Sequence, residues 1–107
     1  MIKLENIENI IVANWKLNGT KTFVEKYLSE IRIKEKKNDK NCVVICPPFP
    51  FLSNIQPIDF YLGSQDCSSF EKGAYTGEVS AEMLSEFGCK FCIIGHSERR
   101  NVFNDND

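Results

Sequence analysis

Short apolar runs recur along the chain and predict its strands. They occupy residues 10–13, 43–46, 60–63 and 91–94. Each run is rich in β-branched or aromatic residues, which are favoured in strands. Because the runs are apolar at odd and even positions alike, they predict parallel strands that are buried on both faces.

The stretches between these runs carry helical periodicity. Residues 21–36 place apolar side chains on one stripe, which predicts an amphipathic helix. The residues of this stripe are Phe23, Val24, Tyr27, Leu28 and Ile31. Thr22 and Glu25 have the S/T-x-x-E spacing of a capping box, so we expect them to cap the start of this helix.

Two shorter helices are expected further along the chain. A Pro-Pro pair ends the second apolar run and precedes a short helix near residues 51–55. Ser80 is a candidate N-cap for a helix that ends at Phe87 before Gly88. The resulting order, β-α-β-α-β-α-β, indicates an α/β fold with a parallel sheet and right-handed crossovers. Periodicity alone does not separate a doubly wound sheet from part of a (β/α)₈ barrel.

Composition and charge narrow the class of protein. The 107 residues suffice for one domain, and 13 Lys and Arg against 15 Asp and Glu give a formal net charge of −2. This balance argues against a basic surface for nucleic acid and against a surface that binds anionic membranes. No apolar run approaches the roughly 20 residues of a membrane helix, and the N-terminus does not read as a signal peptide. We therefore expect a cytoplasmic protein with no nucleic-acid or membrane partner.

The five cysteines allow two interpretations. They are Cys42, Cys46, Cys67, Cys89 and Cys92. An odd number without a secretory signal favours free thiols, and cysteines in strand-like apolar runs behave as small buried hydrophobes. The alternative is a small zinc or thiol module in which the C-x-x-C pair Cys89 and Cys92 acts with Cys42, Cys46 and His96.

Polar side chains that follow two of the strands are candidates for a site. Asn14 and Lys16 end the first strand and should point to the same face. His96 follows the fourth strand, after a glycine, and an imidazole can act as acid, base or hydrogen-bond donor near neutral pH. Ligands of parallel α/β folds bind at the carboxyl ends of strands, so these residues predict one site. Alternatively, Lys16 is the first solvated residue after its strand and His96 caps a short helical turn.

Three segments together resemble the triosephosphate isomerase family. They are NWKLNG at residues 14–19, AYTGEVS at residues 74–80 and GHSERR at residues 95–100. Their order and intervals also fit, and the resemblance runs from about residue 10 to residue 103. It implies a (β/α)₈ TIM barrel that interconverts dihydroxyacetone phosphate and glyceraldehyde 3-phosphate without a cofactor, in glycolysis and gluconeogenesis.

The resemblance also implies roles for single residues. His96 matches the neutral electrophile that polarises the substrate carbonyl, and Lys16 matches the cation that stabilises charge on the substrate. Asn14 matches the neighbouring substrate-contacting amide. Thr76 matches a loop residue that crosses a homodimer interface, and Glu98 matches an acidic residue near the lysine. No metal is implied.

The length of the chain bears on whether it can have isomerase activity alone. A complete barrel needs about 250 residues, so residues 1–107 form a partial TIM-barrel domain with strands one to four and three to four helices. The family's catalytic glutamate and phosphate loops lie on later strands. We therefore expect a fragment or truncated product of an isomerase that is inactive alone. The alternatives are half of a split isomerase with a complementary chain, or the zinc or thiol module.

Overall fold

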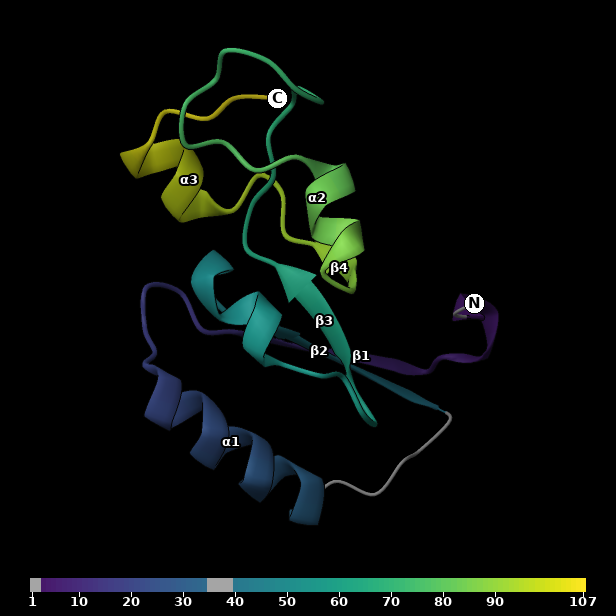
Figure 1. The fold of residues 1–107 in the computed structure, drawn as a ribbon. Helices are drawn as coiled ribbons and strands as arrows, with labels where there is room; N and C mark the ends of the chain where they lie inside the picture. Colours follow the sequence, from purple (N-terminus) through teal and green to yellow (C-terminus); the bar gives the residue numbers. More distant parts are fainter. Residues whose placement is uncertain (1–2, 35–39) are drawn as a thin grey trace.

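Figure 1 shows the computed structural model, which describes residues 3–34 and 40–107. The strands are β1 (Asn9–Asn14), β2 (Asn41–Cys46), β3 (Tyr61–Ser64) and β4 (Cys89–Cys92). The α-helices are α1 (Lys21–Lys34), α2 (Ala81–Glu86) and α3 (Ser97–Val102), and 3₁₀ helices lie at Leu4–Asn6 and Phe49–Asn54.

The strands form one parallel sheet in the order β1-β2-β3-β4. Each strand therefore pairs with the next strand along the chain, as consecutive strands of a (β/α)₈ barrel do. The pairing of β3 with β4 contains a register shift, because Leu62 lies opposite Cys89 whereas Gly63 lies opposite Phe91. This shift leaves one extra residue, Lys90, in β4. The predicted parallel α/β architecture is confirmed.

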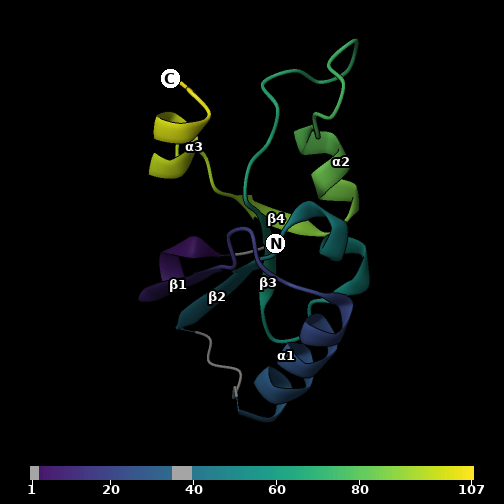
Figure 2. The ribbon, with the colours of Figure 1, turned by 90° about the vertical axis from the view of Figure 1, so that its left-hand side faces the viewer.

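The main core lies between the sheet and the helices α1 and α2, which cover the same face of the sheet (Figure 2). Val24 and Leu28 of α1 and Leu84 of α2 are buried in one cluster with Ile45 and Leu62 of the sheet. A second, smaller cluster contains Cys42, Val44 and Cys46, and the partly buried Phe91 and Ile93 pack against it. The predicted stripe of α1 therefore faces the core, with Val24 and Leu28 at its centre.

The edge strand β1 is exposed, although the sequence predicted strands that are buried on both faces. Ile10, Ile11 and Val12 of β1 are 56%, 51% and 50% exposed. β1 is an edge strand that pairs only with β2, so one side of it has no neighbour among the described residues. The central strand β2 and most of β3 are buried, as predicted for strands with a neighbour on each side.

The helix boundaries correct two predictions. α1 is capped by Thr20, whose Oγ1 accepts a hydrogen bond of 3.0 Å from the backbone N–H of Phe23. The predicted capping box at Thr22 is therefore wrong, because Thr22 already lies inside the helix. Residues 35 and 36 of the predicted helix lie outside the described residues. The predicted cap at Ser80 is confirmed, since its Oγ accepts from the backbone N–H of Met83 at 3.2 Å.

The predicted position of the fourth strand is also wrong. The apolar run at residues 91–94 suggested it, whereas β4 occupies Cys89–Cys92. Its ladder with β3 ends where Ser64 lies opposite Cys92, which leaves Ile94 beyond the sheet and 76% exposed. The short segment expected near residues 51–55 is a 3₁₀ helix at Phe49–Asn54.

Candidate functional site

A cleft of about 320 Å³ lies where the chain leaves the carboxyl ends of the strands. Its polar lining includes Asn14 at the end of β1 and Lys16 just after it, Gln65 and Asp66 after β3, and His96, Glu98 and Arg99 after β4. The structure therefore brings together four of the residues that the sequence singled out, Asn14, Lys16, His96 and Glu98. Parallel strands direct their carboxyl ends to one edge, which explains why these distant segments meet there.

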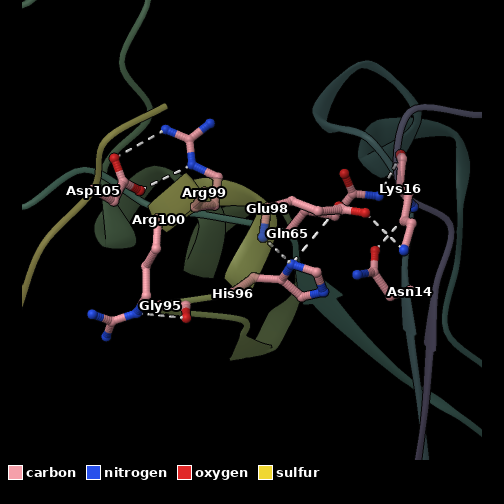
Figure 3. Close-up of polar contacts among 9 residues, drawn as sticks. All are labelled: Asn14, Lys16, Gln65, Gly95, His96, Glu98, Arg99, Arg100 and Asp105. Atoms are coloured by element: carbon pink, nitrogen blue, oxygen red, sulfur yellow. Dashed lines mark hydrogen bonds and ion pairs between the residues drawn. The ribbon is translucent and has the colours of Figure 1, made fainter. Parts of the chain in front are cut away.

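The backbone of Lys16 is held in an unusual conformation. Its φ is +57°, in the left-handed region that non-glycine residues rarely adopt. The Oδ1 of Asn14 accepts from the N–H of Lys16 at 2.9 Å, and the Nε2 of Gln65 donates to the carbonyl of Lys16 at 2.9 Å. These bonds fix the backbone from both sides (Figure 3). Backbone strain held in this way is typical of functional sites, where it sets the direction of a side chain.

Lys16 and Glu98 form the central ion pair of the cleft. The Nζ of Lys16 donates to Oε1 of Glu98 at 2.7 Å, and the two side chains are 53% and 50% exposed. The hydrogen bond from Lys16 lowers the pKa of Glu98 below its ordinary value, against a weaker opposing effect of desolvation. Glu98 is therefore a carboxylate at neutral pH, and its lowered pKa makes it a weak proton acceptor.

His96 is both a helix cap and a wall of the cleft. It is the N-cap of α3, and its Nδ1 accepts from the backbone N–H of Glu98 at 3.1 Å. Because Nδ1 accepts a hydrogen bond, the neutral ring carries its proton on Nε2, where it can be donated to a bound molecule. Capping and participation in a site, which stood as alternatives in the sequence, are therefore compatible.

Sequence reasoning missed three residues of the cleft, Gln65, Asp66 and Arg99. Besides holding Lys16, Gln65 donates from Nε2 to the carbonyl of Cys46 at 2.9 Å, so it joins the ends of three strands. Arg99 pairs with Asp66 at 3.5 Å and with Asp105 at 3.0 Å, which ties α3 to the segment after β3. Gln65 and Asp66 directly follow β3, so the strand-end rule that selected Lys16 would also have selected them.

Other predicted features lie outside the cleft. Thr76 is exposed, in the segment between β3 and α2, and does not line the cleft. Phe70 and Tyr75 of the same segment stack with their ring centroids 3.8 Å apart.

In the described part of the chain, no group of three or more His, Cys, Asp or Glu residues could hold a metal ion, which gives the zinc module no support. Within the same residues, no helix is long and apolar enough to cross a membrane.

Removing the charge of Lys16 should raise the pKa of Glu98. In the Lys16→Met variant the carboxylate loses its strongest stabilising contact, so its pKa should return toward the ordinary value for glutamate. The matching control is Lys40→Met, because Lys40 pairs with Glu8 at 3.1 Å, and it should leave Glu98 unchanged. The measurement is a pH titration of the Glu98 carboxyl carbon by NMR.

The sign of the linked stability follows from the lowered pKa. The pair stabilises the fold at pH values above the pKa of Glu98 in the unfolded chain, and this contribution is lost as pH falls through the lower, folded-state pKa. A Glu98 titration that is identical in wild type and Lys16→Met would contradict the assigned cause.

Comparison with known proteins identifies relatives that match the segment containing all four strands. The family model for triosephosphate isomerase matches residues 9–107. The chain is 47% identical over 102 residues to a triosephosphate isomerase of Azoarcus sp., covering 92% of this chain and 40% of that relative. It is 42% identical over 101 residues to a triosephosphate isomerase of Halorhodospira halophila and covers 39% of that relative. It is 38% identical over 105 residues to a triosephosphate isomerase of Aquifex aeolicus and covers 42% of that relative. The chain thus spans about 40% of the length of these relatives.

Proposed function

Because the chain belongs to the triosephosphate isomerase family and matches its N-terminal part, we propose that it supplies the Lys16 and His96 portion of an isomerase site. The substrate of that site is a triose phosphate, interconverted between dihydroxyacetone phosphate and glyceraldehyde 3-phosphate. The observation that carries the proposal is the cleft in which Lys16 and His96 converge from β1 and β4.

The chemistry of the cleft suits an enediolate. Negative charge develops on the substrate oxygens when a proton leaves the carbon beside the carbonyl. The ammonium of Lys16 opposes this charge, and the Nε2–H of His96 can donate a hydrogen bond to the same region. Glu98 holds Lys16 by an ion pair of 2.7 Å, and Asn14 fixes its backbone, so the cation is oriented before substrate enters.

We propose that the general base comes from outside the cleft, because both carboxylates of its lining are already paired, Asp66 with Arg99 and Glu98 with Lys16. Glu98 pairs with Lys16 and has a lowered pKa, which makes it unsuited to accept a proton from carbon. The family resemblance puts the catalytic glutamate and the phosphate loops on later strands. We therefore propose that the 107-residue chain is inactive alone and that its site is completed by the remaining strands of a barrel.

Thr76 is proposed as a contact of a homodimer. It is exposed beside the stacked pair Phe70 and Tyr75, which are themselves 48% and 43% exposed. A partly apolar segment that leaves the carboxyl end of β3 is suited to docking against a second subunit, as the family resemblance implies.

A chimera tests the proposed function directly. Residues 9–107 replace the matching segment of the Azoarcus relative, and the purified chimera should isomerise glyceraldehyde 3-phosphate. The His96→Gln variant of the chimera should lose about 10²–10⁴-fold in kcat/KM, the range of a positioned proton-transfer group. The matched control is Asn101→Asp, an exposed position of α3 that does not line the cleft. A folded chimera without turnover would overturn the proposal.

A further inference from the structure

A second cavity, distinct from the cleft, is lined by three cysteines. It has a volume of about 190 Å³ and lies between α2 and β4. Ser64, Cys67, Leu84, Cys89 and Cys92 are among its lining residues, and none of them lines the cleft. Cys67 and Cys92 both line this cavity, and the nearby Cys92 is one cause of the raised pKa of Cys67. The Sγ of Cys92 donates to the carbonyl of Ile93 at 3.4 Å. The Oγ of Ser64 is fully buried and has no hydrogen-bond partner among the described residues.

The register of the sheet brings the two thiols together. Cys92 is the last residue of β4 and lies opposite Ser64, the last residue of β3. Cys67 follows Ser64 by three positions, in the segment that leaves the sheet. The extra residue in β4 also alters the usual alternation of side chains, because a bulge adds one position to one strand only. Cys89 and Cys92 can therefore line the same cavity although three positions separate them.

We propose that Cys67 and Cys92 are an oxidisable pair that closes to a disulfide between the end of β4 and the segment after β3. Both thiols line the same cavity and lie at the ends of neighbouring segments, so the disulfide forms when they approach to the S–S bonding distance of about 2.05 Å. This proposal does not rest on the isomerase function, because neither cysteine belongs to the cleft.

The remaining cysteines are poorer partners. Cys42 and Cys46 are 0% and 1% exposed and belong to the cluster on the other face of the sheet. Cys89 lines the same cavity but is only 8% exposed, and it is buried in the main core beside Leu84. Cys92 is the exposed member of the set, and Cys67 is half-buried. The exposed thiol is thus the one that a dissolved oxidant reaches first.

The oxidant is a small-molecule disulfide, for which glutathione disulfide is the probe. Cys92 loses its proton to solvent and attacks one sulfur of the probe, whose S–S bond breaks and releases one glutathione thiolate. Cys67 then loses its proton and attacks the sulfur of Cys92, which expels the second glutathione thiolate. The two thiolates take up two protons, so two electrons pass from the cysteine pair to the probe.

The second step should depend on pH. In the reduced chain, burial, the Cys92 thiol and the nearby Asp66 carboxylate raise the pKa of Cys67 to about 11, and burial and Asp66 continue to raise it in the mixed disulfide. Lys90 of β4 also lines the cavity, while the α2 residues that line it, Ala81, Leu84 and Ser85, are uncharged. Because the thiolate is the nucleophile, closure should accelerate close to tenfold for each pH unit below that pKa.

The crosslink joins two segments that carry residues of the cleft. Cys67 directly follows Asp66, the partner of Arg99, and Cys92 precedes His96 by four positions. A disulfide there removes freedom from the unfolded chain and should raise the melting temperature by several degrees. Reduction with dithiothreitol should reverse the shift.

Peptide mapping tests the pairing. The reduced 107-residue chain is incubated with glutathione disulfide at pH 7.5 and 8.5, quenched with acid, alkylated and mapped by mass spectrometry without reduction. We expect a Cys67–Cys92 crosslink, loss of two of the five thiols and faster closure at pH 8.5. The Cys89→Ser variant should form the same crosslink, whereas Cys67→Ser should stop at a mixed disulfide of Cys92 with glutathione.

Three results would overturn the proposal. One is a Cys89–Cys92 crosslink in the wild type, and another is a wild type that stops at the mixed disulfide. The third is a set of crosslinks identical to that formed in 6 M guanidinium chloride, because oxidation would then be independent of the fold.

Discussion

Measured alone, the 107-residue chain should turn over glyceraldehyde 3-phosphate no faster than buffer. A missing general base costs roughly 10²–10⁴-fold, and the one carboxylate beside Lys16 is engaged in an ion pair and has a lowered pKa. The family resemblance puts the phosphate loops on later strands of the barrel, so we expect residues 1–107 by themselves to lack that grip on the substrate. Loss of that binding energy lowers transition-state stabilisation further.

The assay couples glyceraldehyde 3-phosphate turnover to oxidation of reduced nicotinamide cofactor. The His96→Gln variant is purified in parallel, because activity that remains in this variant comes from contaminating isomerase. Turnover by the wild-type chain that disappears in His96→Gln would contradict the expected inactivity. Mixing the chain with a second chain that contains the rest of the Azoarcus barrel extends the test. Recovered turnover, with a complex on size exclusion, would support a two-chain enzyme, and no complex would count against it.

The central strands and the strand-end site were predictable because their signals are local. β2 is a buried run of apolar residues, and a strand with neighbours on both sides must be apolar on both faces. Lys16 and His96 interrupt or follow such runs with polar side chains, and parallel pairing then requires their ends to meet. The edge positions were not predictable in this way. Ile11 and Ile45 have the same side chain, but Ile45 lies between two strands and packs against the helices, whereas β1 has one neighbouring strand.

Features that depend on register were missed for a physical reason. The C-x-x-C spacing offered Cys89 and Cys92 as one possible thiol pair, but the sequence did not bring Cys67 to the same cavity as Cys92. That placement follows from the alignment of β3 with β4, including its shift at Gly63, and one sequence contains no signal for such an alignment. The cap of α1 is similar, because Thr20 and Thr22 are equally good capping residues and the path of the preceding loop decides between them.

Two identical substitutions in neighbouring strands should have very different costs. Ile45 is 0% exposed in the main core, whereas Ile11 is 51% exposed on β1. Ile45→Ala should therefore lower the free energy of unfolding by about 2–5 kcal/mol, the range for deleting a buried isoleucine side chain. Ile11→Ala removes the same atoms from a half-solvated site and should cost about 1 kcal/mol or less.

Urea unfolding can measure this difference through Trp15, the only tryptophan, which is buried in the same cluster as Ile45. Small domains have a total stability of about 5–15 kcal/mol, so Ile45→Ala should shift the midpoint strongly or leave the chain unfolded. Ile11→Ala should leave the midpoint nearly unchanged. Equal costs would contradict the exposure of β1 and would mean that another chain covers its apolar side chains in solution.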